Sequence, residues 1–147
     1  MTLALRIGLA ALALIEMTLG LWTLLFPESF YDDVSTVNLT PPYSEHLFRD
    51  FGGATLGLAI VLGAAAIWPQ TKWVIVALLA YLAFAVPHLV FHLGHLHDAS
   101  DVEAAILTIG LWVLVVLPLA LIGVALVRMR RGGRVPRGTG SPKPARD

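Results

Sequence analysis

The sequence has no cysteine and few charged residues. Of its 147 residues, only 14% are Asp, Glu, Lys or Arg. The absence of cysteine excludes disulfides, iron-sulfur clusters and thiolate metal sites, so any metal ion would need nitrogen and oxygen ligands. The low charge accompanies 57% apolar residues and a mean hydropathy of +0.78, far from the composition of soluble domains. The composition therefore predicts an integral membrane protein.

The common motifs for nucleotide binding and hydrolysis are also missing. There is no glycine-rich phosphate loop, no GxSxG and no HExxH in the chain. The arginine-rich C-terminal segment has no interleaved aromatic residues, and we therefore expect no nucleic-acid binding.

Four apolar stretches have the length of roughly 20 residues that a membrane-spanning helix needs. We expect these helices over residues 3–26, 47–68, 73–94 and 102–128, with Ser100 and Glu103 forming a capping box before the last. In the first stretch Glu16 directly follows the short apolar core, which is not typical of a cleaved signal peptide, so we expect the stretch to be retained. The predicted fold is an all-α integral membrane protein, an antiparallel four-transmembrane-helix bundle over residues 1–127. Residues 129–147, rich in Gly, Pro and Arg, are expected to form a disordered basic tail.

The charges are sorted between the two sides of this bundle. Seven of the ten Lys and Arg residues lie in the last twenty residues, and Arg6 and Lys72 fall on the same side. The acidic loop residues fall on the other side: Glu28, Asp32, Asp33, Glu45, Asp50, Asp98, Asp101 and Glu103. By the positive-inside rule, both termini are expected to be cytoplasmic.

A group of histidines lies at the outer end of the third predicted helix. At 100° per residue, His88, His92 and His95 share one stripe with Tyr81 and Phe84, whereas the fourth histidine of the group falls in the loop. Pro87 predicts a kink just below the histidines.

The spacing of these histidines is compatible with metal binding. His88 and His92 are four residues apart, and His92 and His95 are three apart, so either pair can share a metal ion. A further ligand would come from His46, Asp50, Glu16 or Asp101. Nitrogen and oxygen ligands suit zinc or iron. A role in pH sensing and a hydrated polar groove without metal are the alternatives.

Glu16 interrupts the first predicted helix. It lies roughly 13 Å from the outer end of this helix. A carboxyl group at that depth is costly unless it faces the bundle interior or finds a partner. We expect Arg49, near the outer end of the second helix, to be that partner.

The second predicted helix carries polar and small residues on one face. His46 and Asp50 align there with Gly53 and Gly57. The GxxxG spacing of the two glycines predicts that this face packs closely against another helix.

Three segments carry a resemblance to known families: "FPESFYDD", "SEHLFRDFGGATLGLAIVL" and "PHLVFHLGHLHD". They resemble small bacterial four-span membrane proteins of the DoxX-like and DUF4345-like kind, and the last is similar to segments of actinobacterial membrane proteins. The resemblance covers approximately residues 1–127 and implies a compact four-helix bundle in the bacterial plasma membrane. Some DoxX relatives are similar to subunits of quinone-linked oxidoreductases. The histidine stripe departs from the general DoxX pattern, so no catalytic residue is carried over.

These features lead us to expect a non-enzymatic accessory or ligand-binding subunit. Its outward-facing polar cup would contain His46, His88, His92, His95, Glu16, Arg49 and Asp50. The alternative is a metal- or quinone-linked membrane redox subunit that uses the same histidines. The expected partners are the lipid bilayer and either further copies of the chain or a membrane partner subunit.

Overall fold

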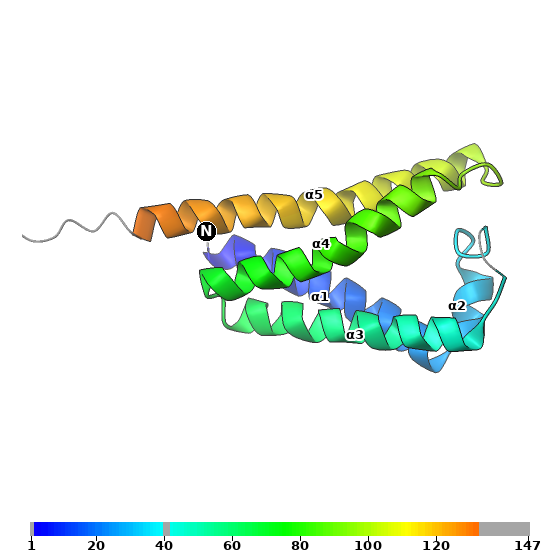
Figure 1. The fold of residues 1–147 in the computed structure, drawn as a ribbon, viewed down its shortest axis with the longest axis horizontal. Coiled ribbons are helices and arrows are strands. Elements are labelled where there is room, and N and C mark those ends of the chain that lie inside the picture. Colours follow the sequence, from blue (N-terminus) through cyan, green and yellow to red (C-terminus); the bar gives the residue numbers. More distant parts are fainter. Residues whose placement is uncertain (1, 40–41, 133–147) are drawn as a thin grey trace, which may run out of the picture.

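The computed structural model describes residues 2–39 and 42–132, and these ranges contain helices and no strand. The elements are α1 (Thr2–Leu25), α2 (Pro27–Asp33), α3 (Glu45–Ile67), α4 (Thr71–Leu93) and α5 (Asp101–Gly132), shown in Figure 1. The four longer helices are long and apolar enough to cross a membrane, as the sequence predicts. α5 continues to Gly132, beyond the expected boundary at residue 128. The rest of the expected tail, residues 133–147, lies outside the described residues.

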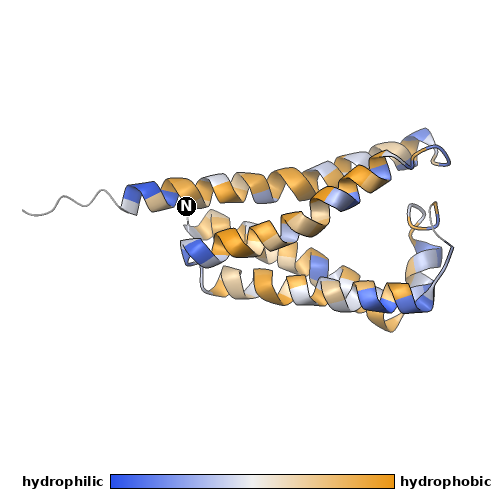
Figure 2. Cartoon of the chain, in the orientation of Figure 1, coloured by the Kyte–Doolittle hydropathy of each residue, from blue (hydrophilic) through white to orange (hydrophobic). Residues whose placement is uncertain are grey.

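The long helices form two pairs. In Figure 1, α1 lies along α3, α4 lies along α5, and the short α3–α4 connection joins the pairs. The pairs lie close together near the N-terminus and diverge toward the end that carries α2, and α4 curves along its length (Figure 1). Apolar residues cover the length of all four helices, while polar residues gather toward their ends (Figure 2).

The tightest part of the core lies near the N-terminus, where the two pairs meet. Its fully buried side chains are mostly leucines from three helices: Leu5, Leu9, Leu12, Leu62, Val74 and Leu78. Large aliphatic side chains fill the space between helices there and hold the two pairs together.

α1 and α3 approach each other closely at two glycines. A Cβ atom on Gly52 would lie 2.7 Å from a backbone nitrogen of α1, and one on Gly20 would lie 3.0 Å from the carbonyl oxygen of Gly52. Gly53 and Gly57, by contrast, face open space. The close helix packing that the sequence predicts at Gly53 and Gly57 is therefore not made by any helix of the described residues. The buried face of α3 is a neighbouring one: Phe48, Gly52, Thr55, Ala59, Leu62 and Ala65.

The predicted capping box at the start of α5 is confirmed. The Ser100 hydroxyl donates to Glu103 Oε2 at 2.7 Å, and the Ser100 backbone N–H donates to the same oxygen at 3.0 Å. In return, the Glu103 backbone N–H donates to Ser100 Oγ at 3.3 Å. These bonds satisfy N–H groups that have no partner within the helix.

Replacing Ser100 by alanine is expected to lower the free energy of unfolding by about 1 kcal/mol, because the hydroxyl cap is lost. Reversible unfolding in detergent, followed by circular dichroism, measures this change. Ser44→Ala is the matched control, since Ser44 Oγ accepts one bond from the Leu47 N–H at 3.5 Å. Equal losses in the two variants would contradict the stronger role assigned to Ser100.

Candidate functional site

Glu16 is the most deeply placed acidic residue in the described part of the chain. Its side chain is 2% exposed, and it accepts a hydrogen bond from the hydroxyl of Tyr81, which is fully buried. Glu16 Oε2 has no hydrogen-bond partner within the described residues. The contact joins α1 to α4 and so connects the two helix pairs. A polar oxygen without a partner is left inside an otherwise apolar region.

The expected ion pair between Glu16 and Arg49 was wrong. Arg49 Nε donates to Glu45 Oε1 at 2.8 Å, and its Nη1 donates to the carbonyl oxygen of Leu24. Leu24 lies in the last turn of α1, where carbonyl groups lack helical partners and attract cations. Arg49 is thus held at the helix ends, while Glu16 lies two turns deeper, roughly 12 Å along α1.

Tyr81 is the partner that sequence reasoning missed. It already stood on the stripe that contains the histidines of α4, at helical spacing from Phe84 and His88. The signal for this contact in the sequence was that Tyr81 lies on the histidine stripe at a depth similar to that of the Glu16 carboxyl. The helical pattern alone did not show which face of α4 meets α1.

The predicted stripe on α4 is present from Phe84 to His92. The rings of Phe84 and His88 are stacked with centroids 5.1 Å apart, and those of His88 and His92 meet edge to face at 4.5 Å. Phe51 of α3 contacts Phe84 with ring centroids 5.8 Å apart. His88 and His92 are both half-buried. Aromatic rings therefore lie between the Glu16–Tyr81 contact and the two imidazoles.

His95 leaves this stripe because α4 ends at Leu93. Its ring stacks on Phe91 with centroids 4.1 Å apart, and its Nδ1 lies 2.7 Å from the Phe91 carbonyl oxygen. His97 lies in the following loop, as expected, with its Nε2 atom 3.0 Å from Asp98 Oδ2.

His46 and Asp50 lie on the surface of α3. The His46 Nε2 and Asp50 Oδ2 atoms are 3.4 Å apart, and the two side chains are 89% and 67% exposed. The face that carries them is the one with Gly53 and Gly57, which turns away from the interior of the bundle. His46 and Asp50 therefore do not join Glu16 in an interior cup.

The candidate metal ligands do not converge within the chain. All five histidines fall in the described ranges, and these ranges contain no group of three His, Asp or Glu side chains placed to hold a metal ion. The expected metal set of His46, His88, His92 and His95 is separated, with His88 and His92 left as a pair. Two imidazoles alone leave a tetrahedral zinc ion short of protein ligands.

An aromatic cluster at the acidic end was not foreseen. Phe30 of α2 packs against Trp22 of α1 and Phe48 of α3, with ring centroids 5.4 and 6.0 Å apart. Tyr31 and Tyr43 add to the cluster at 5.5 Å from each other. Two adjacent aromatic residues of "FPESFYDD", Phe30 and Tyr31, contribute to it, and this aromatic pair was the signal in the sequence. The cluster anchors α2 across the ends of α1 and α3.

The family model described as "Domain of unknown function (DUF4345)" matches residues 4–90, more than half of the chain. The matched region contains nearly all of α1, all of α2 and α3 and most of α4, including Glu16, Tyr81 and His88. No curated protein and no solved structure matches the chain.

Proposed function

Since the chain belongs to the DUF4345 family, whose description assigns no activity, we propose a function from its structure. The protein is a multi-pass membrane protein without enzymatic activity of its own. It binds a small amphipathic molecule between its two helix pairs, as an accessory or ligand-binding subunit.

The proposed placement is an antiparallel four-helix bundle in a bacterial inner membrane with both termini in the cytoplasm. Arg6 donates to the carbonyl of Ile67 at 3.3 Å, and Arg128 donates to the carbonyl of Pro69 at 2.8 Å. These contacts bring a cation of α1 and a cation of α5 to the α3–α4 connection. The positive-inside rule assigns an end with such cations to the cytoplasm. The resemblance to DoxX-like proteins supports the bacterial membrane.

The buried Oε2 of Glu16 is the single observation that carries the ligand proposal. A carboxyl group in apolar surroundings without a cation is held in its neutral form and needs hydrogen-bond partners. A hydroxyl or carbonyl group of a ligand satisfies this requirement. Phe84 and Phe51 then offer an aromatic surface to the apolar body of the molecule.

The geometry favours ligand binding over proton conduction. Tyr81 and His88 are two turns apart on α4, roughly 10.5 Å along the helix axis. The ring of Phe84 stacks on His88 between them and has no group that relays a proton. A continuous chain of polar side chains is therefore missing along this stripe.

The test is to purify the full chain in mild detergent and identify its small molecules by organic extraction and mass spectrometry. A compound with a hydroxyl or carbonyl group and an apolar body is expected in the wild type and depleted in Glu16→Met, which keeps the side-chain length. Glu45→Met is the matched control, because the Glu45 side chain is 60% exposed and pairs with Arg49. Identical extracts from wild type and Glu16→Met would refute the proposal.

The redox alternative is favoured by one observation, the contact between the rings of His88 and His92. A second subunit would complete the ligand set of zinc or iron, or a quinone would occupy the same space. Metal content and the visible spectrum, recorded with and without His92→Ala, distinguish the two functions. About one equivalent of metal that is lost in the variant would establish the alternative. Metal-free, colourless protein after metal-replete growth would eliminate the metal-dependent form, and a quinone in the extract would show the quinone-linked form.

A further inference from the structure

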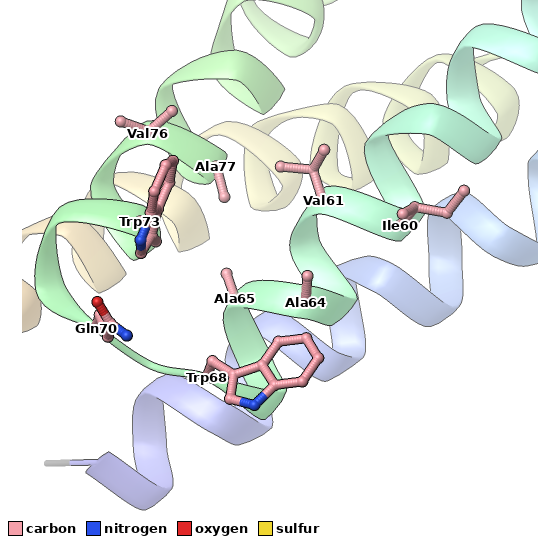
Figure 3. Close-up of a pocket in the computed structure, with 9 residues that line it drawn as sticks. All are labelled: Ile60, Val61, Ala64, Ala65, Trp68, Gln70, Trp73, Val76 and Ala77. Atoms are coloured by element: carbon pink, nitrogen blue, oxygen red, sulfur yellow. The ribbon is translucent and has the colours of Figure 1, made fainter.

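A groove lies between α3 and α4 at the end of the molecule that carries Arg6 and Arg128. It has a volume of about 580 Å³ and opens beside the α3–α4 connection (Figure 3). Ala64, Ala65 and Ala77 line it with short side chains, and Trp68 and Trp73 flank it, one on each side of the connection. The groove exists because alanines here do not fill the space between the two helices.

The two tryptophans indicate the depth of this groove in a membrane. Their side chains are 64% and 63% exposed, although both are large and mostly apolar. Tryptophan is enriched at the boundary between hydrocarbon and headgroups. The mouth of the groove therefore lies at the headgroup level, and its alanine floor faces the hydrocarbon.

Three cationic side chains lie at the α3–α4 connection beside the groove, and none of them pairs with a carboxylate in the described part of the chain. Arg6 and Arg128 donate to backbone carbonyls on either side of Trp68, and Lys72 directly precedes Trp73 and is exposed. Their positive charge is thus available to an anion at the headgroup level.

We propose that this groove is a binding site for an acidic phospholipid, with an acyl chain between α3 and α4 and the headgroup phosphate near Lys72. A second copy of the chain is a poorer occupant. Copies in one membrane share the same orientation, so a second copy would present its own basic end at this depth, whereas an acidic headgroup supplies the opposite charge. The proposal rests on the proposed membrane placement and is independent of the ligand site at Glu16.

Quenching of tryptophan fluorescence tests the site directly. The full chain with Trp22→Phe and Trp112→Phe, whose remaining tryptophans are Trp68 and Trp73, is reconstituted into phosphatidylcholine vesicles. Two sets of vesicles are compared. One contains phosphatidylglycerol with bromine atoms on its acyl chain, and the other contains the same fraction of phosphatidylcholine with bromine atoms on its acyl chain. Bromine quenches tryptophan on contact, and quenching is expected to be stronger with the acidic lipid and to weaken as salt is added.

Two variants separate the headgroup contact from the acyl-chain contact. Lys72→Gln is expected to lower the preference for phosphatidylglycerol about fivefold, since one lysine near an acidic surface contributes about 1 kcal/mol. Arg130→Gln is its control, because it removes the same charge from the last turn of α5. Ala64→Leu fills the groove and is expected to reduce quenching by both lipids, whereas Ala54→Leu, exposed on the same helix, leaves quenching unchanged.

Several results would overturn the proposal. Equal quenching by the two brominated lipids would show that the site does not select an acidic headgroup. Equal effects of Lys72→Gln and Arg130→Gln would show that the lipid preference comes from general surface charge and not from a binding site at Lys72. A smaller oligomer in Ala64→Leu, together with weak quenching of the parent protein by both lipids, would show that a second copy occupies the groove. Inorganic phosphate added at the same concentration as the acidic lipid is expected to have no effect, and competition by it would indicate a free-phosphate site.

Discussion

Replacing Gly52 by alanine is expected to lower the free energy of unfolding by about 1–3 kcal/mol, because it overpacks the contact between α1 and α3. The new Cβ atom would lie 2.7 Å from the backbone nitrogen of Leu24 and 2.7 Å from Thr23 Oγ1. A backbone atom in a helix cannot yield unless the whole helix shifts. Denaturant unfolding in mixed micelles, followed by circular dichroism, measures the loss.

Gly53→Ala is the matched control for Gly52→Ala, since it makes the same change at the next residue. A Cβ atom on Gly53 meets no atom within 4 Å. Alanine is the better helix former, so this variant is expected to be as stable as the wild type or more stable by up to about 1 kcal/mol. A comparable loss in both variants would mean that α1 and α3 do not cross at Gly52.

Replacing Tyr81 by phenylalanine is expected to destabilise the protein by about 1–3 kcal/mol, because it leaves a buried acceptor without its donor. The Tyr81 hydroxyl donates to the Glu16 carboxyl, whose Oε2 already lacks a partner within the described residues. Phenylalanine keeps the volume of the ring, so the change isolates the hydroxyl. The same unfolding measurement in detergent reports it.

A double-mutant cycle separates this contact from other effects of the two residues. Replacing both partners by apolar side chains removes the unsatisfied group, so Glu16→Met with Tyr81→Phe is expected to be more stable than the sum of the single losses implies. Additive losses would show that Glu16 and Tyr81 do not interact.

Features that depend on local sequence were predicted correctly. Four long apolar helices follow from stretches of sufficient length, since the number of residues sets the span of a helix. The capping box of Ser100 and Glu103 depends on residues three positions apart and forms as predicted. The resemblance of "SEHLFRDFGGATLGLAIVL" to DUF4345-like proteins agrees with the family match over residues 4–90.

The orientation of each helix about its axis was predicted only in part. The Glu16 carboxyl was expected to face the bundle interior or to find a partner, and Glu16 is buried. His46, Asp50, Gly53 and Gly57 were also placed toward the interior, but they lie on an exposed face of α3. In a soluble protein, polar residues mark the outer face of a helix, whereas lipid is as apolar as a protein core, so the apolar pattern does not distinguish the two faces.

The sequence by itself determined the all-helical class of the protein, its four long apolar helices, the cap of its last helix and the separation of its charges, because length, composition and short spacings are local properties. Only the tertiary structure decided which helices pair, that Gly20 and Gly52 make the close contact, and that Tyr81 meets Glu16. It also separated His46, Arg49 and Asp50 from the stripe of Phe84, His88 and His92. These outcomes depend on which faces of four apolar helices fit together, and close packing of complementary shapes selects those faces where hydropathy does not.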